Sequence, residues 1–329
     1  IIFFKLFMNN LLNHSYINLC IQDKDKNKSK SKKHSQFKID INFKSSKKMN
    51  PVNFDESIYK ILYKYKQYID IYYENWNKVK SYTNLFETLS YSNYTKNNKP
   101  LTLYEPISRA YYKLWEILCN TKIINENQNK YVYCGLAEGP GGFIECFNFY
   151  RRRFSKAQPK DIINCITLKP YNNDIPGWTK SQRIFRECNE YNISFGLDDT
   201  GDLYNIDNIK HFAEEFTKKA DLVSADGGFD FSSDYSNQEI SAFRLIFCEI
   251  VTGLSILNVD GHMIIKIFDL YNDATVDLLY MLTKYFDKIH IIKPFTSRSA
   301  NSEKYIVCKN FKGISTEKLK NLYELVEEL

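Results

Sequence analysis

Short apolar runs alternate with stretches of helical periodicity from residue 105 onward, and this alternation constrains the fold more than any other feature of the sequence. Strands that alternate with helices form a parallel sheet that is covered on both faces. The last two runs are joined by a short polar link, which predicts an antiparallel hairpin at one edge of the sheet. We therefore predict an α/β domain with a mostly parallel, seven-stranded sheet, its strands at residues 131–137, 161–168, 193–197, 221–226, 262–268, 288–295 and 304–311.

Segments of different composition flank this domain, which we place at residues 105–312. Residues 1–48 are basic and low in complexity, as expected of a disordered segment that is either a solvated tail or a loose tether for a nucleic acid. Residues 49–104 have apolar residues at helical spacing, and their many tyrosines are either core residues or stacking surfaces for bases. Residues 313–329 are predicted to form a capped amphipathic helix.

Charge and cysteine content narrow the class of protein. A formal net charge of +6 and a pI of about 8.6 suit a nucleic-acid partner. None of the 8 cysteines stands in a paired zinc-ligand pattern, so we expect a reduced intracellular protein and not a secreted one. Its expected location is the nucleus or the cytoplasm, and the cytoplasm if the chain is viral.

No stretch is long enough to span a bilayer, which predicts no membrane partner. Met8 and Met49 are both candidate start residues.

The segment EGPGGF at residues 138–143 concentrates glycine in a chain that has only 12 glycines. It connects a predicted strand to a predicted helix, where an open parallel sheet binds its ligands. Absent Cβ atoms let the backbone approach a ligand, and Pro140 stiffens the turn. The spacing differs from the G-x-G-x-x-G motif, which argues against a nicotinamide dehydrogenase. Glu138 disfavours a pyrophosphate and suits a ligand with positive charge and hydroxyl groups, such as S-adenosylmethionine, whereas a purely structural tight turn is the alternative.

A second polar cluster follows the third predicted strand at the same edge of the sheet. Asp198, Asp199 and Asp202 can hold a ribose or an adenine amino group there, with Asp199 and Asp202 the better candidates. Helix capping by the same residues is the alternative, and both can hold at once.

Four polar residues conflict with their local patterns. Asp226 ends a buried strand before two glycines, and Lys266 lies inside another buried strand. Glu303 opens the last strand, and Lys113 flanks the apolar stripe of a helix. A buried lysine is costly unless it is paired, so two lysines and two carboxylates that meet at one sheet edge would satisfy one another. The group is either a structural ion network or a catalytic cluster.

The ordered motifs resemble those of FtsJ-like ribose 2′-O-methyltransferases, most of all the branch that methylates the first transcribed nucleotide of capped mRNA. The resemblance covers residues 105–312 through the segments SRAYYKLWEIL, AEGPGGFIE, DDTGDL, DLVSADGGFD, IIKIFD and KPFTSRSANSEKYIVC. It implies a Rossmann-like S-adenosylmethionine-dependent methyltransferase fold and RNA, expected to be 5′-capped mRNA, as the partner. It also implies a catalytic Lys-Asp-Lys-Glu tetrad on Lys113, Asp226, Lys266 and Glu303.

The resemblance would place the methyl donor, S-adenosylmethionine, against Glu138, Gly139, Pro140, Gly141, Gly142, Phe143, Leu168, Asp199, Asp202 and Asp226. The chain departs from the family pattern at Gly135, where many relatives carry an acidic residue. Glu138, three positions later, is the candidate to take over the task of that acid.

Lys266 is the candidate base for the ribose 2′-hydroxyl, and no metal is expected, because the sulfonium of the donor already activates the methyl group. Burial and Lys113 lower the pKa of Lys266, whereas Asp226 and Glu303 raise it, and the sequence leaves this balance open. Candidate phosphate contacts, with a solvated basic surface as the alternative, are Arg109, Arg151, Arg152, Arg153, Lys169, Lys293, Ser297 and Arg298.

Two alternative functions stay open at this point. A 2′-O-methyltransferase of ribosomal or transfer RNA would use the same chemistry with a different substrate groove. An inactive methyltransferase fold that serves as an RNA-binding subunit is the other alternative, and the complete tetrad argues against it.

Overall fold

The structure, a computed structural model, describes residues 56–71, 75, 86, 104–171, 175–216, 218–228, 238–299 and 301–329. Its centre is a seven-stranded sheet with the order β3-β2-β1-β4-β5-β7-β6. The strands are β1 (Val132–Leu136), β2 (Ile162–Ile166), β3 (Glu190–Ser194), β4 (Ala220–Ala225), β5 (Leu257–Ile267), β6 (Phe286–Ile292) and β7 (Lys304–Phe311). Strands β1 to β5 pair in parallel, whereas β7 is antiparallel to both β5 and β6. The predicted sheet and its terminal hairpin are confirmed.

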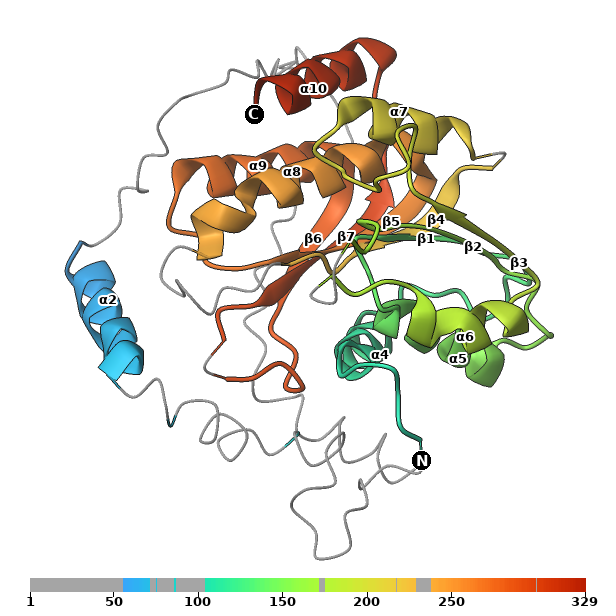
Figure 1. Cartoon of the computed structure of the whole chain (residues 1–329), viewed down its shortest axis with the longest axis horizontal. Coiled ribbons are helices and arrows are strands. Elements are labelled where there is room, and N and C mark those ends of the chain that lie inside the picture. The colour runs from blue at the N-terminus through green and yellow to red at the C-terminus, as the bar shows by residue number, and fades with distance from the viewer. Residues whose placement is uncertain are drawn as a thin grey trace, which may run out of the picture.

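Helices cover both faces of this sheet (Figure 1). One layer contains α4 (Ala110–Thr121), α5 (Gly142–Phe154) and α6 (Gln182–Glu187), which follows the short 3₁₀ helix η4 (Thr179–Ser181). The other layer contains α7 (Ile206–Glu214), α8 (Gln238–Ile256), α9 (Asp273–Tyr285) and α10 (Thr316–Glu328). Each face has its own apolar core, because successive strand residues point to opposite faces: Tyr133 lies in one core and Cys134 in the other.

The flanking segments are only partly described. Residues 1–48 lie outside the described residues, as does most of 49–104. Within the latter range, helix α2 (Glu56–Ile71) stands apart from the two layers in Figure 1. The predicted C-terminal helix is α10, which is capped by Ser315, whose hydroxyl accepts a hydrogen bond from the Lys318 amide.

The strand limits differ most from the sequence prediction in β3, β5 and β6. β5 begins at Leu257 rather than at residue 262, and Leu257 pairs with Ala220 ahead of an irregularity in the β4–β5 ladder. β3 begins at Glu190 rather than at residue 193, because an edge strand pairs on one side only and tolerates the exposed Glu190 and Tyr191. β6 ends at Ile292 rather than at residue 295, because Lys293 leaves the ladder to bind the loop before β7. Apolar content alone does not reveal these effects.

Strand direction determines where the polar residues meet. The carboxyl ends of β1, β4 and β5 lie at one edge of the sheet, and the antiparallel β7 begins at that same edge, with Lys304 opposite Ile267. Residue 226, which follows β4, residue 266 near the end of β5, and residue 303, which precedes β7, are therefore neighbours. This edge is where an open α/β sheet binds its ligands.

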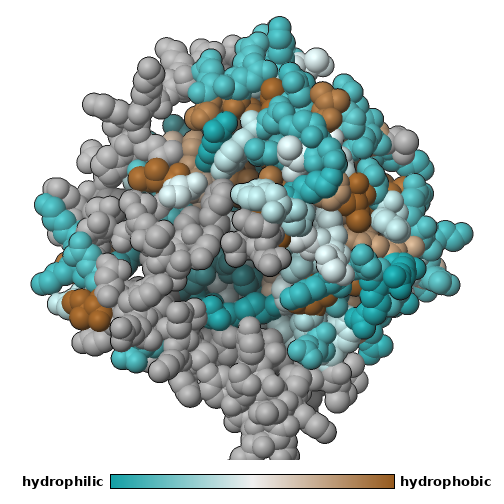
Figure 2. Space-filling model, in the orientation of Figure 1, coloured by the Kyte–Doolittle hydropathy of each residue, from teal (hydrophilic) through white to brown (hydrophobic). Residues whose placement is uncertain are grey.

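On the face shown in Figure 2, hydrophilic side chains are the most common in the described part of the chain, and hydrophobic residues form small separate groups. Among the described residues, no helix is both long enough and apolar enough to cross a membrane.

Arg151 corrects one prediction from the sequence. Its side chain is fully buried, donates to Asp161 from Nε (2.8 Å) and Nη2 (3.0 Å), and lies over the ring of Tyr131. Arg151 therefore joins α5 to the beginning of β2, and the prediction that it contacts RNA phosphate is wrong. The three consecutive arginines of α5 concealed this, since only residues 152 and 153 point to solvent.

Replacing Arg151 by alanine is expected to lower the free energy of unfolding by about 3–5 kcal/mol, because it leaves the buried carboxylate of Asp161 without its ion-pair partner. Arg153→Ala, on the exposed side of the same helix, should change it by less than about 0.5 kcal/mol. Urea unfolding of both variants measures the difference. Equal stability of the two variants would contradict the buried ion pair.

Candidate active site

Two lysine–carboxylate pairs meet at the carboxyl edge of the sheet. Lys266 Nζ, on β5, lies 3.4 Å from Asp226 Oδ1, just after β4. Lys113 Nζ, on α4, donates to Glu303 Oε2 over 2.8 Å, just before β7. None of these side chains is more than 13% exposed. The structure brings together the four residues that the sequence pattern singled out.

The two pairs are electrically linked. Burial alone would lower the pKa of Lys266, but the carboxylates of Asp226, Glu303 and Glu249 outweigh it and raise that pKa. Burial opposes ionisation of Glu303, yet Lys113 and Lys266 together lower its pKa to about 2. The balance that the sequence left open therefore favours an ammonium on Lys266 in the free protein.

Asp226 is held by two further contacts. Its backbone carbonyl accepts a hydrogen bond from Lys266 Nζ at 2.8 Å, and its Oδ1 accepts one from the Tyr305 hydroxyl at 2.7 Å. Tyr305 is fully buried on β7, directly opposite Lys266 in the β5–β7 register. Sequence reasoning missed Tyr305, although its place opposite Lys266 follows once β7 is paired with β5.

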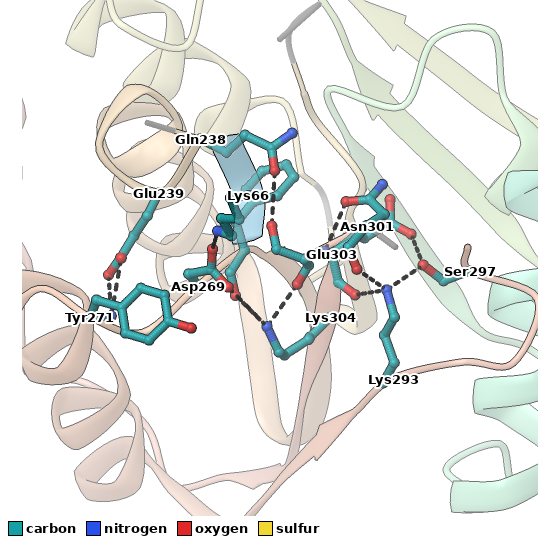
Figure 3. A network of polar contacts seen from close by, with 12 residues as sticks. Lys66, Gln238, Glu239, Asp269, Tyr271, Lys293, Ser297, Asn301, Glu303 and Lys304 are labelled. Atoms are coloured by element: carbon teal, nitrogen blue, oxygen red, sulfur yellow. Dashed lines mark hydrogen bonds and ion pairs between the residues drawn. The ribbon is translucent and has the colours of Figure 1, made fainter. Parts of the chain in front are cut away.

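Residues of the loop between β6 and β7 hold Glu303 in place through hydrogen bonds (Figure 3). Ser297, which is 3% exposed, donates to Glu303 Oε1 at 2.8 Å. Lys293 Nζ donates to the Ser297 hydroxyl and to the backbone carbonyls of Asn301 and Glu303. Both residues therefore orient Glu303, and their contact with RNA stays a prediction.

A second group of charges continues along this edge (Figure 3). Lys304 donates to the carbonyls of Phe268 and Ser302 and lies 3.6 Å from Asp269 Oδ1. Asp269 also accepts a hydrogen bond from Lys66 of helix α2. The Lys66–Asp269 ion pair thus connects helix α2 to the segment after β5, next to the first residue of β7.

A hollow opens between the glycine turn and Asp226. It is lined by Ser108, Ala110, Glu138, Gly139, Pro140, Gly142, Phe143 and Asp226. Six of these residues were predicted as donor contacts. Ser108 and Ala110 were not, because they lie just before α4 and at its first residue, and only the fold brings this part of the chain to the turn.

Glu138 occupies the space in front of Gly135. A Cβ atom at Gly135 would lie 2.7 Å from Glu138 Oε2, so the carboxyl of Glu138 fills the place of a side chain at residue 135. Both of its oxygens accept from the Tyr133 hydroxyl, and Ser224 donates to Oε1. Burial raises the pKa of Glu138 well above its usual range. Burial thus favours the protonated form of Glu138 over the carboxylate expected from the sequence, while the hydroxyls of Tyr133 and Ser224 oppose this shift.

The glycines of the turn admit protein neighbours. A Cβ at Gly141 would lie 2.4 Å from Ser181 Oγ, and φ there is +102°. A Cβ at Gly142 would lie 2.2 Å from Ser108 Oγ. The expectation that the absent Cβ atoms serve close approach of a ligand is therefore incomplete: they also let the segments before α4 and α6 close around the turn.

The acidic loop after β3 is organised by Asp198, which accepts hydrogen bonds from Thr200, Asn205 and Asn208. The N-cap of α7 is Asn205, whose side chain accepts from the Asp207 amide, so the predicted capping of this helix by the aspartates themselves is wrong. Asp199 is exposed and pairs with Lys169. Asp202 accepts from the Tyr204 amide. The loop packs on the end of β2 beside Leu168, so these predicted donor contacts share that region of the sheet edge.

The remaining basic candidates lie in different places. Arg109 donates to the Thr296 carbonyl at 2.8 Å, next to the loop that carries Ser297. Arg298 is half-buried in that loop. Arg152 is exposed on α5 and pairs with Glu187 of α6. Their contacts with RNA, like that of Lys169, stay predictions.

Comparison with known proteins now adds to this geometry. The model of the FtsJ-like methyltransferase family matches residues 106–311. The chain belongs to this family. The match includes all four charged residues and the glycine turn, and it confirms the resemblance inferred from the motifs and the predicted fold class.

Curated relatives agree with the family. The chain is 32% identical over 255 residues to "Cap-specific mRNA (nucleoside-2'-O-)-methyltransferase 2" of Drosophila melanogaster, which covers 72% of this chain and 36% of the relative. It is 31% identical over 211 residues to "Cap-specific mRNA (nucleoside-2'-O-)-methyltransferase 1" of Dictyostelium discoideum, with 60% and 28% covered. The chain thus spans about a third of the length of these relatives.

Gly135→Ala is expected to cost about 1–3 kcal/mol of stability, because the new methyl group meets the Glu138 carboxyl. The same substitution should cost less in a Glu138→Ala background, where the space is free. We expect an interaction energy of about 1 kcal/mol or more from urea unfolding of the four proteins of this cycle.

Gly135→Ala combined with Arg153→Ala is the control, since the second site is distant and exposed and the two costs should add. If the costs of Gly135→Ala and Glu138→Ala also added, Glu138 would not fill the place of a side chain at residue 135.

Proposed function

We propose that this chain transfers the methyl group of S-adenosylmethionine to a ribose 2′-oxygen of capped mRNA, at the first transcribed nucleotide. The observation that carries the proposal is the meeting of Lys113, Asp226, Lys266 and Glu303 beside the hollow at the glycine turn, in a chain of the FtsJ-like methyltransferase family. The names of the relatives specify capped mRNA and 2′-O chemistry, which favours this substrate over ribosomal or transfer RNA.

The hollow suits the donor. Its walls offer the carboxylate of Asp226, the hydroxyl of Ser108, the ring of Phe143 and the N-terminus of α5. When bound, S-adenosylmethionine supplies a methyl group on a positively charged sulfur, so the electrophile is already activated. The predicted contacts of Leu168, Asp199 and Asp202 would extend the site along the sheet edge toward the loop after β3.

Lys266 has the central role in the proposed chemistry. Its neutral amine accepts the proton of the ribose 2′-hydroxyl while the 2′-oxygen forms a bond to the methyl carbon and the carbon–sulfur bond breaks. Asp226 and Glu303 favour the ammonium form in the free protein, so Lys266 must lose its proton before it can act. Lys113 and Glu303 orient the substrate and the amine, and this orientation supplies a large part of the rate gain.

The RNA is proposed to reach the same edge of the sheet. Arg298 lies in the loop before Glu303, Arg109 donates to the Thr296 carbonyl of that loop, and Lys169 lies beside the predicted donor region. Residues 105–312 are proposed as the catalytic domain, with residues 1–48 and 49–104 as an N-terminal extension. An mRNA substrate places the reaction in the nucleus or the cytoplasm.

Lys266→Ala is expected to reduce methyl transfer to a capped transcript by about 10²–10⁴-fold, because the proton acceptor is lost. Lys266→Arg should fail as well, since a guanidinium hardly deprotonates. Donor affinity, measured by calorimetry, should stay within about threefold in both variants, because the carboxylate of Asp226 is retained. The measurement is transfer from labelled S-adenosylmethionine to matched capped and uncapped transcripts, with the modified ribose mapped.

Lys309→Ala is the matched control, because Lys309 lies on β7 toward the opposite edge of the sheet and donates to the Thr121 carbonyl. It should keep transfer within about twofold. Normal transfer by Lys266→Ala would remove the proposed base. Equal transfer to uncapped RNA would overturn the capped substrate, and a label on the second nucleotide would overturn the proposed position.

A further inference from the structure

One peptide unit connects the proposed base to a buried carboxyl that the mechanism does not use. The carbonyl of Asp226 accepts a hydrogen bond from Lys266 Nζ at 2.8 Å. The N–H of the same peptide unit, which belongs to Gly227, donates to Glu249 Oε1 at 3.2 Å. Glu249 lies on α8, and the carbonyl and the N–H of one trans peptide unit point in opposite directions. The peptide therefore stands between an ammonium and a carboxyl.

The two glycines of this turn leave room for both groups. A Cβ at Gly227 would lie 2.2 Å from Glu249 Oε1, and a Cβ at Gly228 would lie 2.9 Å from Lys266 Nζ. Any side chain at residue 227 would displace the carboxyl, and one at residue 228 would crowd the amine. Gly227 and Gly228 therefore fit a turn that packs against Glu249 at the first glycine and against Lys266 at the second.

Glu249 is an unusual buried carboxyl. It is 1% exposed, and its Oε2 has no hydrogen-bond partner among the residues that the structure describes. Glu239, on the same helix, differs: both of its oxygens accept from the Tyr271 amide. A buried carboxyl oxygen without a partner is costly, so packing and hydrogen bonding alone give a poor account of Glu249.

We propose that Glu249 is a positioning residue for methyl transfer, which acts on Lys266 through the Asp226–Gly227 peptide and, when ionised, favours the ammonium form of that lysine. The inference rests on the function proposed above. A negative charge at the peptide N–H polarises the unit and makes its carbonyl a stronger acceptor for Lys266. The charge also acts on the amine directly through a medium of low polarity.

The charge states support this direction. Burial is the main cause that raises the pKa of Glu249, Lys266 lowers this pKa, and Asp226 raises it further. The net result is a pKa of about 8. Glu249 is therefore ionised in the pH range where Lys266, whose pKa is raised, loses its proton. The titratable and charged groups around the pair are Asp226 after β4, Glu138 after β1, Asp202 and Tyr204 before α7, Arg244 and Cys248 on α8, Glu303 before β7, Tyr305 on β7, and Lys113 on α4.

Glu249→Gln keeps an oxygen for the Gly227 N–H and removes the charge, so it should lower the pKa of Lys266. We expect the rising limb of the methyl-transfer rate against pH to move down by about one pH unit, which is about a tenfold faster rate at a pH on that limb. Glu239→Gln is the matched control, because it makes the same change on α8 at a carboxyl that holds the amides of residues 271 and 272. Its profile should not move.

Glu249→Leu removes the acceptor as well as the charge. We expect it to lower the rate at the plateau by about tenfold or more, because the peptide that orients Lys266 is released. Since this variant can fail to fold, Glu249→Gln carries the test. An unchanged profile in Glu249→Gln, with the wild type active, would overturn the proposal and leave the function standing.

A measurement that does not depend on methyl transfer distinguishes the proposed link between Glu249 and Lys266 from the proposed function. The pKa of Lys266 can be followed by NMR of protein labelled at the lysine ε-carbon, with Lys266→Arg to assign the signal. It should be lower in Glu249→Gln and unchanged in Glu239→Gln. A lower pKa in a protein that methylates no RNA would support the link and reject the function, and an unchanged pKa would reject the link.

Discussion

The mutual neutralisation of four buried charges is the interaction on which the site depends. Lys113, Asp226, Lys266 and Glu303 lie at the edge of an apolar sheet, where any one of them alone would be costly to bury. Each lysine is in contact with a carboxylate, and Lys266 is also close enough to Glu303 to lower its pKa. Removal of one charge would leave its partner unpaired, so the cluster acts as a unit.

The topology of the sheet brings these four charged residues together. β4 and β5 end at the same edge, which brings Asp226 and Lys266 together. β7 runs in the opposite direction between β5 and β6, so its first residues begin where the others end and place Glu303 beside the pair. The loop before β7 then holds Glu303 through Ser297 and Lys293. The hairpin therefore completes the site as well as closing the sheet.

The sequence predicts the strands, the glycine turn and the four charged residues, because each charge conflicts with a strong local pattern. It does not predict the partners of long side chains, because these depend on segments far apart in the chain. Arg151 pairs inside the core, and Lys293 and Ser297 bind Glu303, although all three resemble exposed phosphate ligands in the sequence. Glu249 shows no local conflict at all, since a single acid on a helix is ordinary until the turn after β4 is placed against it.

The central claim is that the amine of Lys266 reaches the ribose hydroxyl that is methylated. The most direct measurement is a crystal structure of the protein with a capped oligonucleotide and a non-reactive analogue of S-adenosylmethionine. The account predicts Lys266 Nζ at about 3 Å from one ribose 2′-oxygen next to the cap, with Asp226 and Glu303 still in contact with the two lysines. A ribose bound elsewhere, or a Lys266 amine that points away from it, would contradict the account.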